Sequence, residues 1–187
     1  MNRVALIDTA FVAFFRNVNL GQRNSPTRTQ LESAFLEAGA RSARSFQTNG
    51  TLVFVPGQQN LAEDTARCAA DILKATCALK EPVFTCRLDA LARLVHEDPM
   101  ASFKDAGFFA GYLTLFKPGL EKTLTLPLES ARRDCLVFYV EEGLALSVSR
   151  VLDGKAGDPT PMLERIFGAP VTTRSWNTIT RLVRKFS

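Results

Sequence analysis

The sequence is poor in the residues that most often carry chemistry. Its 187 residues include one histidine, one tryptophan and two tyrosines. The single histidine, His96, lies in the stretch LVHEDP at the expected end of a helix, where attraction to the helix dipole accounts for it. No G-x-S-x-G sequence is present, so a Ser-His triad has little support. The stretch DGKAGD also lacks the spacing of a phosphate-binding P-loop. The sequence therefore indicates no particular reaction.

Cysteine is also scarce, and no two of the four cysteines have C-x-x-C spacing. Cys68 and Cys77 fall nine positions apart on one expected helix, so they point to roughly opposite faces and cannot form half of a zinc site. We expect the thiols of Cys68, Cys77, Cys86 and Cys135 to be free and buried, as in a reducing compartment. We expect neither a metal ion nor a cofactor.

Long hydrophobic runs are missing. The longest apolar stretch, residues 4–15, is interrupted by Asp8 and Thr9, which makes it too short for a membrane span and a poor signal peptide. Hydrophobic residues make up 46% of the chain and charged residues 22%, as in soluble globular proteins. We expect a cytoplasmic protein with no membrane partner.

The pattern of the first half predicts the element order β-α-β-β-α-β. Strands are expected at residues 9–18, 41–47, 51–55 and 82–88. The stretch T-R-T-Q predicts a helix start with Thr27 as N-cap and Gln30 reaching back to it. Asn49-Gly50 predicts a tight hairpin. A second helix is expected after Asn60, with an inner face made of Leu61, Thr65, Cys68, Ala69, Ile72, Ala75 and Leu79, and a short helix from Asp89.

The second half repeats much of this order. Strands are expected at residues 107–116, 134–140, 144–149 and 171–175, with a weak helix or turn at 126–133. Helices are expected from Thr160, with Pro161 in the first helical position, and from Asn177. We therefore expect an α+β fold of two ferredoxin-like (βαββαβ) halves in tandem, residues 1–98 and 107–187, packed into one compact body. Both faces of the strands are apolar, so a second cover is needed, either the other half or the partner in a homodimer.

Three stretches resemble a known family. FRNVNLGQRN is similar to its strand and R-G-I-N-V-G-G loop, SFQTNGTLVF to its T-Y-x-x-S-G-N-V-V-F hairpin, and VTTRSWNTITRL to its closing A-T-x-R-N-W-N-T-V-x-K-L. The family is the bacterial domain of unknown function 1697. The resemblance implies a soluble α+β protein of two ferredoxin-like halves with no established activity. In this sequence Asn17 and Gln22 replace glycines of the loop, and Asn49 and Thr51 replace the serine and asparagine of the hairpin.

The strongest candidate site is the first loop with the helix start that follows it. Free N–H groups at a helix N-terminus beside two guanidinium groups can hold an anion or phosphate. The alternative is a polar loop whose asparagine and serine side chains satisfy their own backbone. The candidate residues are Arg16, Asn17, Asn19, Arg23, Asn24 and Ser25.

A second candidate consists of Arg174, Trp176, Asn177 and Thr178, where a tryptophan and an arginine beside a helix N-terminus could hold the ring and charge of a ligand. The structural alternative makes Asn177 a cap and Trp176 a buried anchor. We expect a small-ligand or anion-binding module. The alternatives are a nucleic-acid-binding protein that uses the basic C-terminal region, which the mild charge of +4 and the doubly apolar sheet disfavour, and an enzyme acting on a phosphorylated or anionic small molecule.

Overall fold

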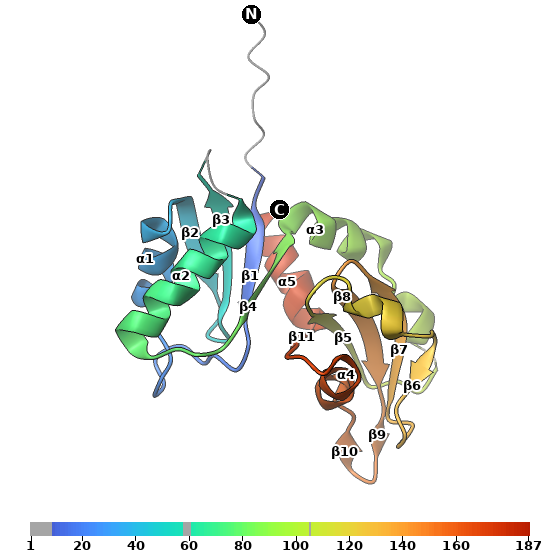
Figure 1. Cartoon of the computed structure of the whole chain (residues 1–187). Helices are drawn as coiled ribbons and strands as arrows, with labels where there is room; N and C mark the ends of the chain where they lie inside the picture. Colours follow the sequence, from blue (N-terminus) through green and yellow to red (C-terminus); the bar gives the residue numbers. More distant parts are fainter. Residues whose placement is uncertain (1–8, 58–60, 105) are drawn as a thin grey trace, which may run out of the picture. The chain divides into compact units, whose positions relative to one another are not determined.

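The computed structural model describes residues 9–57, 61–104 and 106–187. The chain divides into two compact units, one ending at Leu91 and the other comprising Ala92–Ser187. Both combine helices with antiparallel sheet (Figure 1). The first unit contains, in chain order, β1 (Phe11–Phe15), α1 (Arg28–Glu37), β2 (Ala40–Phe46), β3 (Thr51–Pro56), α2 (Ala62–Cys77) and β4 (Val83–Arg87). The element order predicted for this half is confirmed.

The sheet of the first unit has the order β2-β3-β1-β4, and each neighbouring pair is antiparallel. Helices α1 and α2 pack on the face that carries Ala13 and Phe15. Phe35 of α1 lies 4.9 Å from Phe54 between ring centroids and 6.2 Å from Phe15. The alternate residues Val12 and Phe14 are also fully buried, so both faces of β1 are apolar, as the sequence predicted.

The predicted start of α1 is confirmed, whereas the predicted inner face of α2 is only partly right. The backbone N–H of Gln30 donates to Thr27 Oγ1 at 3.2 Å, and the N–H of Thr27 donates to Gln30 Oε1 at 2.8 Å, completing the capping box. Thr65 Oγ1 donates to the carbonyl of Leu61 at 3.2 Å. The predicted inner face of α2 is right only in part: Thr65, Ala69 and Leu79 are buried, but Leu61 is 73% exposed and Cys68 is exposed.

The error on α2 lies in which residues were assigned to the inner face. Leu61 is the N-cap position and lies outside the helix, and the predicted face included the exposed Cys68 but left out Ala62, Ala66 and Leu73, which are buried. The side chains that pack inward are mostly small, and a hydrophobicity pattern gives alanine little weight. The buried residues are Ala62, Thr65, Ala66, Ala69 and Leu73. The expected cap, Asn60, lies outside the described residues.

The turn between β2 and β3 is one residue longer than the connection between the expected strands 41–47 and 51–55. Phe46 and Thr51 form the last pair of the ladder, so four residues make the connection. Positive φ angles occur at Gln47 (58°) and Gly50 (67°). A Cβ on Gly50 would lie 2.7 Å from the Cβ of Val18. Glycine at position 50 is therefore required both by its backbone conformation and by the close approach of Val18.

The second unit has a five-stranded sheet of order β11-β5-β8-β7-β6, and a separate hairpin, β9-β10. A buried cluster that includes Phe116, Val137 and Leu163 fills the space under α4. Its elements, starting with a helix that begins in the first unit, are α3 (Leu88–Glu97), η1 (Ala101–Phe103), β5 (Ala110–Leu115), η2 (Leu120–Thr123), β6 (Leu128–Glu129), β7 (Cys135–Glu141), β8 (Leu144–Ser149), β9 (Val151–Leu152), β10 (Lys155–Ala156), α4 (Pro159–Phe167), β11 (Thr172–Ser175) and α5 (Trp176–Phe186).

The region 126–133 contains no helix. Instead it holds the short strand β6, which pairs with β7, followed by a turn. The hydroxyl of Ser130 accepts the N–H groups of Asp134 and Cys135 at 3.1 and 3.0 Å. Serine side chains that bond to nearby backbone in this way favour turns over helix. This local competition explains why the expected weak helix does not form.

The starts of α4 and α5 also differ from the predictions. Asp158, not Thr160, caps α4, because its carboxylate accepts the N–H of Thr160 at 2.9 Å. Ser175, not Asn177, caps α5, because its hydroxyl accepts the N–H of Thr178 at 3.3 Å. In each case two good capping residues stand close together in the sequence, and the more N-terminal one takes the role.

Helix α5 has the two faces that its sequence predicts. Ile179, Leu182 and Val183 are buried, whereas Arg181, Arg184 and Lys185 are exposed.

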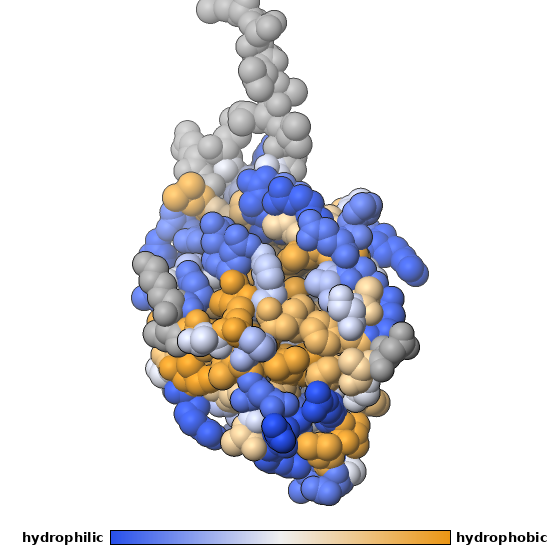
Figure 2. Space-filling model, turned by 90° about the vertical axis from the view of Figure 1, so that its right-hand side faces the viewer, coloured by the Kyte–Doolittle hydropathy of each residue, from blue (hydrophilic) through white to orange (hydrophobic). Residues whose placement is uncertain are grey.

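Figure 2 shows that hydrophobic side chains also reach the protein surface, where hydrophilic ones border them. Among the described residues, the most exposed large hydrophobic side chains are Leu61 in the first unit, at 73%, and Phe109 in the second, at 69%.

Candidate functional site

A pocket of about 360 Å³ lies in the first unit, between the loop after β1 and the connection from α2 to β4. The loop contributes Asn17, Arg23, Asn24 and Ser25, and the connection contributes residues 78–81. Four of the six loop residues singled out in the sequence therefore line one pocket. The other two, Arg16 and Asn19, bond to residues that line it.

The loop is held in place by backbone hydrogen bonds rather than by regular secondary structure. The N–H of Arg16 donates to the carbonyl of Pro82 at 3.0 Å, and the N–H of Leu20 donates to that of Thr48 at 2.7 Å. Asn17 and Asn24 adopt positive φ angles of 50° and 57°, which asparagine tolerates better than most residues. The N–H of Asn19 also donates to Ser25 Oγ at 3.4 Å. The polar residues thus stabilise the loop and line the pocket at the same time.

An ion pair joins the two walls of the pocket. Arg16 Nη1 lies 2.8 Å from Glu81 Oε2, and Asn17 Nδ2 donates to the other oxygen, Oε1, at 3.3 Å. Both charged side chains are about one-quarter to one-third exposed, at 26% and 31%. The carboxylate of Glu81 is thus engaged by a guanidinium and an amide of the loop, which offset its negative charge.

The remaining charged side chains of the pocket are both cations. Arg23 and Lys80 are exposed and line the pocket from opposite walls. No carboxylate of the described residues forms an ion pair with either of them. With Arg16 paired to Glu81, the pocket carries an excess of positive charge.

The start of α1 contributes less to the pocket than the sequence suggested. In the capping box the N–H of Gln30 already donates to the side chain of Thr27. The helix residues Arg28 and Thr29 do not line the pocket. The charge at the pocket therefore comes from side chains, with Arg23 exposed and Arg16 engaged by Glu81.

Lys80 and Glu81 were missed by sequence reasoning. They follow Ala78, which ends α2 in the left-handed conformation with φ 57°, and they precede Pro82. Only the pairing of β1 with β4, in which Phe15 lies opposite Val83, brings this connection next to Arg16. The only signal in the sequence was a lysine and a glutamate just before a proline. This pattern does not indicate which residues lie near them in space.

The second candidate group lies in the second unit. Arg174 Nη1 donates to Thr172 Oγ1 and to the carbonyl of Thr173, both at 2.9 Å. Burial lowers the pKa of Arg174 to about 10, because the charged form loses hydration. Thr178 bonds to the hydroxyl of Ser175 at 2.9 Å, while Asn177 is exposed and Trp176 is half-buried. These three bonds run to neighbouring residues of the same segment and stabilise the start of α5.

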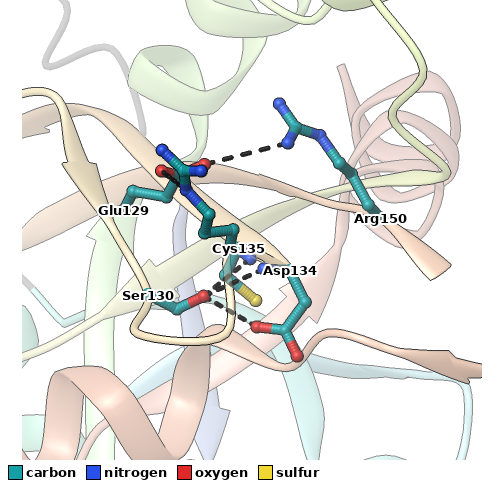
Figure 3. A network of polar contacts seen from close by, with 6 residues as sticks. Glu129, Ser130, Asp134, Cys135 and Arg150 are labelled. Atoms are coloured by element: carbon teal, nitrogen blue, oxygen red, sulfur yellow. Dashed lines mark hydrogen bonds and ion pairs between the residues drawn. The ribbon is translucent and has the colours of Figure 1, made fainter. Parts of the chain in front are cut away.

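A further polar network surrounds the turn between β6 and β7 (Figure 3). The hydroxyl of Ser130 donates to Asp134 Oδ1 at 2.7 Å. Glu129 pairs with Arg150 at 3.8 Å, and the Arg150 guanidinium carbon lies 4.3 Å from the centre of the Phe108 ring. Sequence reasoning did not identify this network, because the β6–β7 turn, Arg150 between β8 and β9, and Phe108 before β5 are far apart in the chain.

Cys135 contributes the thiol of this network. Burial, together with smaller effects of the carboxylates of Asp134 and Asp158, raises the pKa of this thiol to about 12. A thiol with such a pKa stays protonated at neutral pH and is a poor nucleophile. The hydrogen bonds and ion pairs of this network therefore stabilise the β6–β7 turn.

The described residues contain no group of three or more histidine, cysteine, aspartate or glutamate side chains placed to hold a metal ion. None of the helices formed by these residues is both long and apolar enough to cross a membrane.

Comparison with known proteins gives a family and a fold. A family model described as "Protein of unknown function (DUF1697)" matches residues 9–143. No curated protein matches the sequence. The solved structure of the conserved bacterial protein SP0830 from Streptococcus pneumoniae is similar with a TM-score of 0.68 over 96% of this chain and 99% of that one, at 12% sequence identity. At this identity the similarity shows a shared fold alone.

Proposed function

The chain belongs to the DUF1697 family of proteins of unknown function, and we propose that it is a binding module whose first-loop pocket takes a small anionic ligand. The observation that carries this proposal is the pair of exposed cations, Arg23 and Lys80, on opposite walls of one pocket. Neither is neutralised by a carboxylate of the described residues.

The size and composition of the pocket support a small polar ligand. A volume of about 360 Å³ falls at the lower end of the range for small-molecule sites. The amide groups of Asn17 and Asn24 and the hydroxyl of Ser25 add hydrogen-bonding groups to the two cations. Cationic donors form stronger hydrogen bonds to carboxylate or phosphate oxygens than neutral donors do.

The glycine replacements in the first loop are compatible with this proposal. Asn17 has a φ of 50°, so asparagine keeps the left-handed conformation that a glycine would adopt and adds an amide that bonds to Glu81. The positive φ next to Gln22 belongs to Gly21, at 82°. The loop thus keeps the backbone form that glycines allow.

We also propose that the two units are ferredoxin-like halves in tandem. Four strands of the second sheet follow the order β7-β8-β5-β11, which corresponds strand by strand to β2-β3-β1-β4 of the first. In the second unit η2 and β6 stand in the place of the first helix. The four cysteines are free, although only Cys135 is buried as expected, whereas Cys68 is exposed and Cys77 and Cys86 are partly buried. Free thiols support a reducing compartment such as the cytoplasm.

A phosphate titration tests the binding proposal. Inorganic phosphate, followed by amide chemical shifts in two-dimensional NMR, should perturb the signals of Asn17, Asn24 and Lys80. The double variant R23Q/K80Q should bind phosphate about tenfold more weakly or worse, since two charge-assisted contacts are lost.

The matched control is the double variant R44Q/K74Q. It removes the same charge from exposed positions of the same unit that do not line the pocket. Equal weakening in both double variants would mean that net charge, not the pocket, attracts phosphate. Shifts confined to residues outside the pocket would contradict the proposal directly.

A further inference from the structure

A carboxylate lies among the cations of the first-loop pocket. Glu81 lines the pocket together with Arg23 and Lys80, and its side chain is partly exposed. An ionised carboxylate accepts hydrogen bonds and donates none. It therefore repels an anion that comes close, unless that anion brings a hydrogen-bond donor of its own. The presence of Glu81 thus bears on which anions the pocket takes.

The carboxylate of Glu81 is held in one orientation by the loop after β1. Arg16 Nη1 donates to Oε2 at 2.8 Å, and Asn17 Nδ2 donates to Oε1 at 3.3 Å. The backbone N–H of Arg16 also donates to the carbonyl of Pro82, the residue after Glu81, at 3.0 Å. A carboxylate offers about four acceptor positions, so after these two bonds Glu81 still has oxygen lone pairs that can accept a proton donor from a ligand.

We propose that Glu81 makes the pocket selective for anions that carry their own hydrogen-bond donor, such as hydrogen phosphate, over anions that carry none, such as sulfate. This inference rests on the proposed anion-binding function of the pocket. Arg23 and Lys80 attract both kinds of anion. The P–OH group of hydrogen phosphate donates to the Glu81 carboxylate, whereas sulfate presents an oxygen that the carboxylate repels.

The two probes differ in the one property that Glu81 can detect. At pH 8 inorganic phosphate is mainly hydrogen phosphate, which has the same tetrahedral shape and the same charge as sulfate but keeps one proton. Cations alone therefore distinguish the two anions poorly. A fixed acceptor distinguishes them, because it bonds to one ligand and opposes the other, and specificity commonly combines an attractive with a repulsive contact.

The test is an NMR titration of the full chain with sodium phosphate and with sodium sulfate, at pH 8 and matched ionic strength. The amide signals of Asn17, Asn24 and Lys80 report binding in the pocket. The wild type should bind phosphate at least about tenfold more tightly than sulfate, the factor expected from a hydrogen bond to a charged group. E81Q should bind both anions more tightly, and sulfate by the larger factor. The ratio should then fall below about threefold, because a glutamine amide can donate to one anion and accept from the other.

The control variant E63Q removes the same charge from an exposed position of α2 that does not line the pocket, and it should keep the ratio of the wild type. Equal affinities of the wild type for the two anions at the pocket signals would overturn this inference and leave the proposed function standing. An unchanged ratio in E81Q, or a ratio that is lost in E63Q as well, would also overturn it. If neither anion shifts the pocket signals, the proposed function fails and this inference fails with it.

Discussion

Arg16 and Glu81 form an ion pair of 2.8 Å between residues 65 positions apart in the chain. The pair joins the loop after β1 to the connection that leads into β4, and it sets the charge available to a ligand between them. Because both side chains are partly exposed, the contribution of the pair to stability is small, at most about 1 kcal/mol. Its larger effect is on binding, since Glu81 partly neutralises the pocket.

The first prediction concerns the charge of Glu81. Replacing Glu81 with glutamine should raise the affinity for phosphate about threefold or more, because an anion is removed and Arg16 is released. The free energy of unfolding should fall by no more than about 1 kcal/mol. NMR titration and urea unfolding measure the two effects. E63Q, at an exposed position of α2 outside the pocket, is the control, and weaker phosphate binding by E81Q would contradict the prediction.

The second prediction separates backbone strain from steric contact at two glycines. Gly21 and Gly50 both have positive φ angles, 82° and 67°, but a Cβ on Gly21 meets nothing within 4 Å, whereas one on Gly50 meets Val18 at 2.7 Å. G21A should cost about 1 kcal/mol from strain alone. G50A should cost at least about 1 kcal/mol more, because Val18 must move. If urea unfolding showed the same loss in the free energy of unfolding for both variants, Val18 would move at no cost and the prediction would be wrong.

The third prediction concerns the cysteines. Cys68 is exposed and Cys135 is buried, so a thiol reagent at pH 8 should label Cys68 rapidly in the native protein and Cys135 only after unfolding. Mass spectrometry after partial labelling identifies the modified sites. Rapid labelling of Cys135 in the native state would show that the network of Figure 3 opens readily.

The fourth prediction concerns the effect of the Cys135 thiol on stability at high pH. The pKa of Cys135 is raised from 9.0 to about 12 in the folded protein. Between these values the unfolded chain releases the thiol proton while the folded chain keeps it, so stability falls as pH rises through this window. C135A should be less stable at pH 8 but should show a flatter decline from pH 9 upward. Parallel declines in both proteins, measured by chemical unfolding, would contradict this.

The fifth prediction concerns α5. Changing Arg181, Arg184 and Lys185 together to glutamine should alter the free energy of unfolding by less than about 0.5 kcal/mol, because the three are exposed. I179A should cost about 2–5 kcal/mol, because Ile179 is fully buried. The basic face should also give no salt-dependent RNA binding. Binding that disappears in the triple variant would assign a nucleic-acid function to this helix.

The elements that sequence reasoning identified correctly are those fixed by local contacts. Thr27 and Gln30 lie three residues apart, so their capping box can be read directly from the sequence. The cap of α5 could not be, because Ser175 and Asn177 are both good capping residues and only the path of the chain decides between them. The inner face of α2 was misread because its buried residues are mainly alanines.

Only half of the candidate site could be predicted from the sequence, for a related reason. The loop residues 16–25 stand together in the sequence, and their asparagines and arginines were evident. Lys80 and Glu81 reach the same pocket only through the pairing of β1 with β4, and no local pattern reports that pairing. The contact of Glu32 with Ser45 is hidden in the same way, because it depends on how α1 packs on β2.

The bond between Arg16 and Glu81 closes a loop of chain that contains nearly all of the first unit, from the end of β1 to the start of β4. A ligand held between Arg23 and Lys80 would bridge the same two segments as a second, reversible cross-link. Such a ligand would bind only after β1 and β4 had paired, so it would draw the folding equilibrium of the unit toward the native state. At 100 times its dissociation constant, this linkage amounts to about 2.7 kcal/mol. The melting temperature of the unit would then report the ligand concentration.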